Sequence, residues 1–110
     1  MNKAYTLTMG GTTWALDCPK EEQEGNALIA PNTYNKWGKV NGELTITKGA
    51  EIPKVVNIYI VRFDAGAGCA VTFEGWGAEL RWVGGNAPAL TEDKTYEITI
   101  IDNLAMFVEG

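Results

Sequence analysis

The sequence contains no histidine at all and only two cysteines. Without an imidazole, this chain cannot build a Ser-His-Asp or Cys-His catalytic group or a histidine-containing zinc site. Positive charge is also scarce, with 9 Lys and Arg against 14 Asp and Glu and a formal net charge of -5. A nucleic-acid-binding surface needs clustered positive charge, so the composition argues against nucleic acid as a partner. These absences favour a protein that is not an enzyme and that holds no cofactor.

Long apolar runs are missing too. No stretch approaches transmembrane length, and the first residues lack the apolar segment of a signal peptide. We therefore expect no membrane partner, no signal peptide and folding in the cytoplasm. Cys18 and Cys69 lie far apart in the sequence, and nothing local supports a bond between them. Two buried free thiols are favoured over a disulfide, which remains open.

Glycine, by contrast, is plentiful: 13 glycines punctuate short segments rich in β-forming residues. No long segment has the apolar spacing of an amphipathic helix. The hydrophobic fraction of 45% and the charged fraction of 21% are typical of a globular domain. We predict that residues 1–110 form a single β-sandwich domain. Its expected fold is all-β, a jelly-roll-like antiparallel β-sandwich of roughly eight or nine short strands.

The N-terminal part of the chain predicts a hairpin. Residues 5–9 and 12–16 alternate in hydropathy on either side of Gly10-Gly11, and two glycines can supply the positive φ angles of a tight turn. A two-residue turn would place Leu7 opposite Trp14, on one face of the pair. The acidic segment that follows, residues 17–26, is expected to be a solvated loop. Its carboxylates lack the ligand spacing of a calcium loop.

The C-terminal part predicts a second hairpin, around Asp102-Asn103, whose side chains tolerate the left-handed conformation. A two-residue turn there pairs Ile98 with Phe107 and gives one consistent apolar face. Residues 55–63 are apolar at almost every position. Such a strand is expected to be central in its sheet, covered on both faces or by a neighbouring subunit.

Two carboxylates, Glu74 and Glu79, flank the segment Gly75-Trp76-Gly77. A pair of carboxylates beside a tryptophan is found in glycosidase clefts. Nothing in the sequence fixes their separation or raises the pKa of either one, so solvated loop acids are the favoured interpretation. The glycine-rich segments 64–68 and 84–85 lack the following helix of a phosphate-binding loop and are interpreted as turns.

The four tryptophans are the strongest candidates for binding residues, because aromatic rings stack on sugars and anchor interfaces. Trp76, between two glycines, is expected on a loop and partly exposed. Two roles remain open for it: a contact with a ligand or partner, or a side chain that packs under its own loop. The core is the favoured place for Trp14, Trp37 and Trp82. The candidate glycan or interface contacts are Trp76, Trp37 and Tyr34.

Several motifs recur in an order that is known from one group of proteins. They are Pro31-Asn32-x-Tyr34-x-x-Trp37-Gly38, Ile58-x-Ile60-x-Arg62-Phe63, Trp82-x-Gly84-Gly85-x-x-Pro88-x-Leu90 and Lys94-x-Tyr96-x-Ile98-x-Ile100. Over residues 32–108 the chain thereby resembles the C-terminal module of bacteriophage and prophage structural proteins, of the head-fibre, tail-fibre and baseplate-appendage kind.

The resemblance implies a β-sandwich module that decorates a virion or forms a fibre tip. It also implies self-association as a homo-oligomer, contact with other virion proteins and, in some cases, contact with host-surface glycans. None of the matched residues is marked by the family as catalytic or cofactor-binding. We therefore predict a non-catalytic phage or prophage structural protein located in the virion. The alternative is a carbohydrate-binding module that recognises glycans through exposed aromatic side chains.

Overall fold

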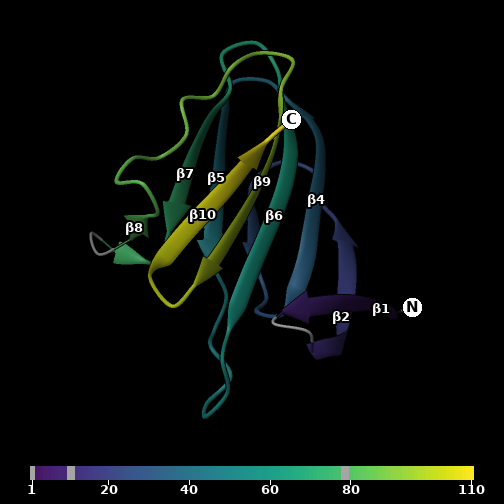
Figure 1. Cartoon of the computed structure of the whole chain (residues 1–110). Coiled ribbons are helices and arrows are strands. Elements are labelled where there is room, and N and C mark those ends of the chain that lie inside the picture. Colours follow the sequence, from purple (N-terminus) through teal and green to yellow (C-terminus); the bar gives the residue numbers. More distant parts are fainter. Residues whose placement is uncertain (1, 10–11, 78–79) are drawn as a thin grey trace.

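The computed structural model describes residues 2–9, 12–77 and 80–110, with only the backbone described for residues 2–9 and 12–17. The described part is all-β and contains ten strands (Figure 1). They are β1 (Asn2–Met9), β2 (Thr12–Glu22), β3 (Ala27–Ile29), β4 (Thr33–Val40), β5 (Glu43–Lys48), β6 (Ile58–Ala65), β7 (Ala70–Glu74), β8 (Arg81–Trp82), β9 (Thr95–Ile101) and β10 (Leu104–Glu109). The sequence predicted eight or nine strands, and the surplus comes from the very short β3 and β8.

The strands form two sheets that face each other (Figure 1). The larger sheet has seven strands in the order β1-β2-β4-β6-β9-β10-β8, and the smaller has three in the order β3-β5-β7. From β2 to β7 the chain changes sheet after every strand. In this part of the chain, the strands of the larger sheet run in one direction and those of the smaller sheet in the opposite direction. Neighbouring strands within a sheet are therefore parallel there.

The expected antiparallel pairing is therefore wrong for much of the molecule. β2 with β4, β4 with β6, β3 with β5, β5 with β7 and β10 with β8 all pair in parallel. Only β1 with β2, β6 with β9 and β9 with β10 pair antiparallel in the described residues. The all-β, two-sheet prediction is confirmed, whereas the jelly-roll connectivity is not confirmed.

The core lies between the two sheets. On the central strand β6, Tyr59, Val61 and Phe63 are almost completely buried and point toward the smaller sheet, and the residues between them point outward. The same alternation buries Ile98 and Ile100 of β9. A strand with period-two burial places one face in the core, and the opposite sheet supplies the other half of that core.

Both predicted hairpins have the expected register. Leu7 pairs with Trp14, although the turn at Gly10-Gly11 lies outside the described residues. Ile98 pairs with Phe107, and Asp102 in the turn has a φ of 54°. Hydrophobic alternation and a two-residue turn are sufficient to set this register.

The predicted loop at residues 17–26 is wrong for its first half. β2 continues through Glu22, and Lys20 pairs with Tyr34 of β4. Pairing with β4 satisfies the backbone of this polar segment, and side-chain polarity does not prevent such pairing. Cys18 and Cys69 are both free thiols, which was the favoured interpretation. Cys18 is buried as expected, whereas Cys69 is only half-buried. No helix in the described ranges could span a membrane.

Candidate assembly surface

Trp37 belongs to the core, as the sequence favoured. Its side chain is only 2% exposed, and its Nε1 donates a hydrogen bond to the carbonyl of Gly25 at 2.8 Å. The indole thus closes the space between the sheets and has no face free for a ligand. Of the two roles considered for Trp37, packing is the one that this placement supports.

Trp76 is also buried, with 4% of its surface exposed, so the expectation of a partly exposed loop residue is wrong. The neighbouring glycines explain the difference. Gly75 and Gly77 have φ angles of 99° and 71°, which turn the chain so that the indole enters the core. A Cβ on Gly75 would lie 2.8 Å from the Cβ of Lys48, so a larger residue could not take this path.

The Trp76 ring packs edge-on against two other aromatic rings. Its centroid lies 5.3 Å from that of Tyr59 and 5.8 Å from that of Phe73, both in T-shaped geometry. Its buried Nε1 has no hydrogen-bond partner among the described residues. Edge-to-face packing brings the positive edge of one ring to the negative face of another, which favours this arrangement. Trp76 is therefore a core residue in this structure.

Tyr34 is the one predicted contact residue that reaches the outer face of the larger sheet. Its hydroxyl donates to Glu97 Oε2 at 3.0 Å, and the guanidinium of Arg62 interacts with the same hydroxyl. Burial of the phenol raises the pKa of Tyr34, and Glu97 raises it further, while Arg62 opposes both. The pKa of Arg62 is raised by its hydrogen bond to Tyr34. This polar cluster occupies one end of the outer face.

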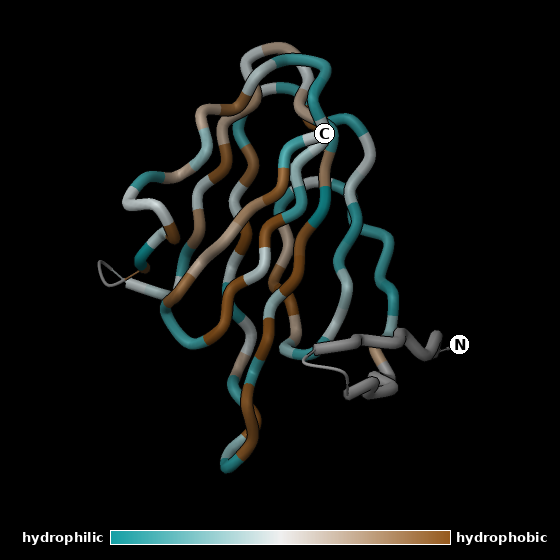
Figure 2. Tube along the Cα trace, in the orientation of Figure 1, coloured by the Kyte–Doolittle hydropathy of each residue, from teal (hydrophilic) through white to brown (hydrophobic). Residues whose placement is uncertain are grey.

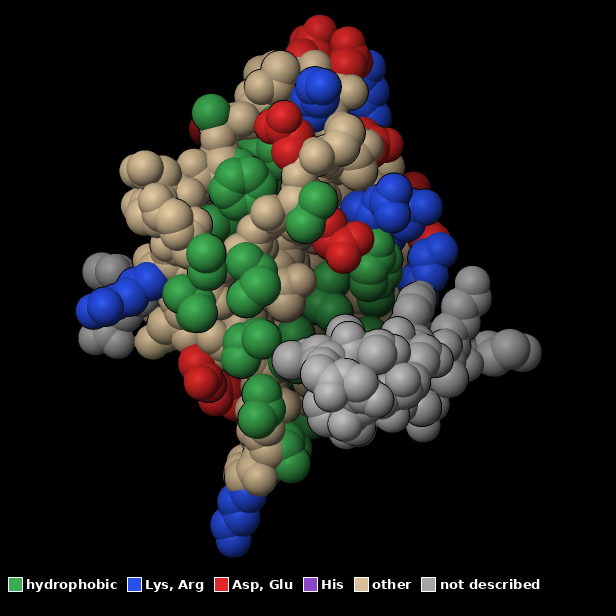
Figure 3. Space-filling view, in the orientation of Figure 1, with side chains coloured by type: hydrophobic (Ala, Val, Ile, Leu, Met, Phe, Trp, Pro, Cys, Tyr) green, Lys and Arg blue, Asp and Glu red, His purple; other side chains and the backbone are tan. Residues whose placement is uncertain are grey.

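The other end of that face is apolar. β6, β9 and β10 lie side by side, and their outward side chains form rows across the sheet: Ile58 beside Ile101 beside Leu104, and Ile60 beside Thr99 beside Met106. Val108 stands at the end of the next row, beside Glu97 and Arg62 of the polar cluster, with 70% of its surface exposed. We call Ile58, Ile60, Ile101, Leu104, Met106 and Val108 the outer patch. Figure 3 shows hydrophobic side chains gathered over these strands.

A protruding loop extends the apolar surface. Residues 49–57 form a finger at the start of β6 that stands out from the body of the molecule (Figures 1 and 2). Ile52, Val55 and Val56 on it are all exposed. Asn57 holds its shape, because its Oδ1 accepts from the Ile52 backbone at 2.8 Å and its Nδ2 donates to the carbonyls of Ile52 and Val55 at 3.0 Å each. The finger is an ordered structure with apolar side chains directed to solvent.

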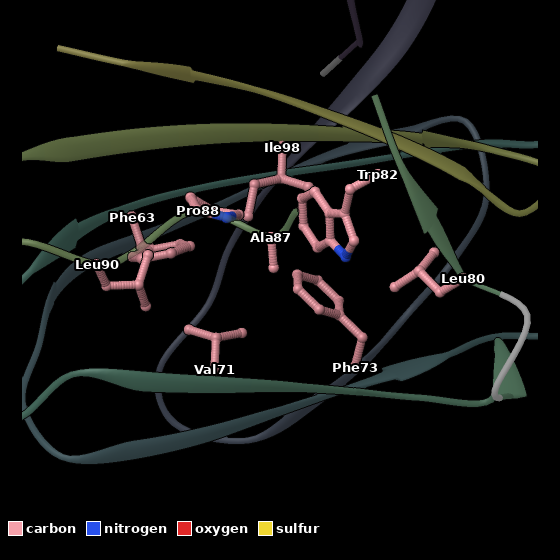
Figure 4. A pocket seen from close by; sticks show the side chains of 9 residues that line it. All are labelled: Phe63, Val71, Phe73, Leu80, Trp82, Ala87, Pro88, Leu90 and Ile98. Atoms are coloured by element: carbon pink, nitrogen blue, oxygen red, sulfur yellow. The ribbon is translucent and has the colours of Figure 1, made fainter. Parts of the chain in front are cut away.

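An apolar cavity of about 220 Å³ lies between the sheets at the side closed by residues 83–94 (Figure 4). The rings of Phe73 and Trp82 meet in it at 6.0 Å. None of the lining side chains carries a charge, and only Trp82 has a polar side-chain atom: they are Phe63, Val71, Phe73, Leu80, Trp82, Ala87, Pro88, Leu90 and Ile98. Sugar hydroxyls need several donors and acceptors, so this cavity does not suit a glycan.

The carboxylate pair considered for glycosidase chemistry cannot be assembled from the described residues. Glu74 is exposed and accepts a hydrogen bond from Thr47 at 3.4 Å, and Glu79 lies outside the described residues. Within the ranges that the structure describes, no three acidic or cysteine side chains lie close enough together to hold a metal ion.

The fold and the surface define a two-layered all-β protein with an apolar patch on the outer face of its larger sheet. The chain matches no protein-family model, no curated protein and no solved structure at a significant level. The sequence pointed to aromatic residues as contacts and missed the outer patch. A sequence signal for the patch was present. Residues 104, 106 and 108 are apolar although they alternate with the residues of β10 that face the core.

Proposed function

We propose that this chain is a non-catalytic structural module of a bacteriophage or prophage virion, which acts by assembly and surface presentation. The outer patch is the observation that carries the proposal. One face of a sheet in such a domain is ordinarily solvated and polar, whereas here six apolar side chains share it. Contiguous exposed apolar surface on a folded protein marks an interaction site.

The resemblance to fibre and appendage modules supports the same proposal from the sequence. Such modules associate with copies of themselves and with other virion proteins, and an apolar sheet face is suited to both. The net charge of -5 keeps the unassembled chain soluble despite its exposed apolar side chains. In this proposal the chain is made in the cytoplasm of a bacterial host and ends in the virion.

Light scattering after size exclusion tests the proposal across a range of protein concentrations. We expect the wild type to have a mass above that of one chain at high concentration, and Met106→Lys to have the mass of one chain. Thr72→Lys, which adds the same charge at an exposed position of the smaller sheet, is the matched control and should behave as the wild type. A wild-type protein that stays monomeric at every concentration would contradict self-assembly.

The glycan-binding alternative retains one of its three aromatic residues at the surface, Tyr34, since Trp37 and Trp76 are buried. A glycan array measures it directly, with Tyr34→Ala as the comparison. Specific binding that disappears in this variant would favour the alternative over the structural role. Binding that survives the substitution would place the glycan site elsewhere.

A further inference from the structure

The edge of the larger sheet is open along the second half of β10. β8 pairs with β10 only at Leu104 and Ala105. From Met106 to Glu109, β10 has β9 on one side and no strand of the described chain on the other. The outward edge of a strand carries backbone N–H and C=O groups that can pair with a further strand.

The hydrogen-bond pattern shows which groups face that edge. Gly110 and Thr95 exchange both backbone hydrogen bonds, at 2.8 and 2.9 Å. In an antiparallel ladder, such pairs alternate with pairs that are not hydrogen-bonded. Val108 therefore also exchanges hydrogen bonds with β9. Phe107 and Glu109 direct their N–H and C=O groups away from β9, toward the open edge. Ala105 lies two residues before Phe107 and faces the same edge. Its carbonyl accepts a hydrogen bond from the backbone N–H of Val83 at 2.8 Å there.

This edge lacks the usual protection against pairing. Natural edge strands carry charges, proline or bulges that discourage another strand from joining them. The segment Met106-Phe107-Val108 has no charge and no proline, and all three of its side chains are exposed. Glu109 is the next charged residue along the strand, and its carboxylate accepts a hydrogen bond from Tyr96 at 2.9 Å.

We infer that this edge pairs with the same edge of a second copy of the chain, antiparallel, with Val108 at the twofold axis. This inference rests on the proposed assembly function and names the partner. Phe107 of each copy then lies opposite Glu109 of the other, and their unpaired backbone groups exchange hydrogen bonds. Pairing centred on Phe107 instead would bring the second copy against Ala105, whose carbonyl is already bonded to Val83. In the register centred on Val108, all the open N–H and C=O groups of Phe107 and Glu109 are used.

The pairing joins the two larger sheets into one continuous sheet. The interface is isologous and closes after two copies, so it does not propagate into a filament. Both outer patches lie on the same side of the joined sheet. Met106 of each copy lies opposite Gly110 of the other in this register, so Met106→Lys places its charge at the joined edge. Val108, the most exposed side chain of the outer patch, gains a neighbour in Val108 of the second copy.

Disulfide trapping tests this register. In Val108→Cys the two new thiols face each other across the twofold axis, with Cα atoms about 4.5 Å apart, which a disulfide can bridge. In Met106→Cys the two Cα atoms are offset by four residues along the strands, roughly 13 Å, which it cannot bridge. Under mild oxidation we expect a covalent dimer for Val108→Cys and little for Met106→Cys or for the wild type, which retains both native thiols.

Equal trapping of both variants would overturn the inference, because it would indicate random collision. The absence of trapping in Val108→Cys would also overturn it. If the wild type still assembled and Met106→Lys did not, the proposed function would stand without this register. A strictly monomeric wild type would contradict both the proposed assembly function and this inference.

A second pair of variants tests the edge hydrogen bonds. Phe107→Pro removes the N–H that faces the edge and leaves the bonds to β9 in place, since Phe107 does not use its N–H there. Phe107→Ala removes the same ring but keeps the N–H. We expect light scattering to give the mass of one chain for the proline variant and of two for the alanine variant, with cooperative melting of both. The same mass for the two variants would overturn the inference.

Discussion

Both faces of the larger sheet carry apolar side chains on β6, β9 and β10, but the two faces differ in what covers them. On the inner face Phe63 and Ile98 are buried against the smaller sheet, whereas on the outer face Ile60 and Met106 have no covering layer in the described chain. Apolar character alone therefore does not reveal which side of a strand is the core. The difference can be tested by making similar changes on the two faces.

The largest difference is expected from truncation of an inner aromatic residue. Trp76→Ala removes a buried ring that packs on Tyr59 and Phe73, so we expect the free energy of unfolding to fall by about 3–5 kcal/mol. Val108→Ala, on the outer face, should change it by less than about 0.5 kcal/mol under dilute, monomeric conditions. Urea unfolding followed by tryptophan fluorescence and circular dichroism measures both. Similar losses for the two variants would contradict the assigned burial.

Two tyrosines give a smaller contrast. Tyr59 is buried, and its hydroxyl donates to the carbonyl of Gly49 at the base of the finger, at 2.8 Å. Tyr59→Phe leaves that acceptor without its partner, and the expected cost is about 1–3 kcal/mol. Tyr34→Phe breaks a hydrogen bond to Glu97 on the outer face, where water can replace it, so a smaller loss is expected. Thermal unfolding of the two variants compares them, and a larger loss for Tyr34→Phe would reverse the assignment.

Adding one methylene group should stabilise only the inner side. Val71 lines the cavity between the sheets, and Val71→Ile fills part of it, with an expected gain of about 0.5–1 kcal/mol. Val108→Ile adds the same group on the exposed face and should leave stability unchanged below the concentration at which the chain assembles. Chemical denaturation curves for both variants test this. A loss of stability in Val71→Ile would show that the space is not free to accept the group.

The smallest effect concerns alkaline pH. Burial raises the pKa of both Tyr34 and Tyr59 above their usual range, so in the folded chain each phenol keeps its proton to a higher pH than in the unfolded chain. Their contribution to stability is complete below the unfolded pKa, about 10, and is lost as pH rises through the folded pKa. We expect a fall in melting temperature above that pH.

Tyr34→Phe should make this fall shallower, and Tyr59→Phe likewise. The thiols of Cys18 and Cys69, whose pKa is also raised by burial, remain in both variants and serve as a common background. An unchanged pH dependence in both variants would contradict the raised tyrosine pKa values.

Prediction from sequence succeeded where structure is local. The pairing of Ile98 with Phe107 follows from alternation and a two-residue turn, and both are properties of adjacent residues. The parallel pairing of β4 with β6 could not be inferred in this way. Between these two strands the chain forms β5 in the other sheet, so the paired residues are far apart in the sequence. Trp76 was misplaced for a related reason: its flanking glycines indicate a turn but do not indicate the direction of that turn.

The sequence by itself determined that this protein is all-β, that it has no histidine for imidazole chemistry, and that its terminal hairpins have their observed registers. These properties depend on composition and on residues within one hairpin of each other. Only the tertiary structure decided that Trp76 is a core residue, that the outer patch is uncovered and that β10 has an open edge. Burial and edge exposure depend on which distant strands lie alongside, and the hydropathy of a segment does not specify its neighbours.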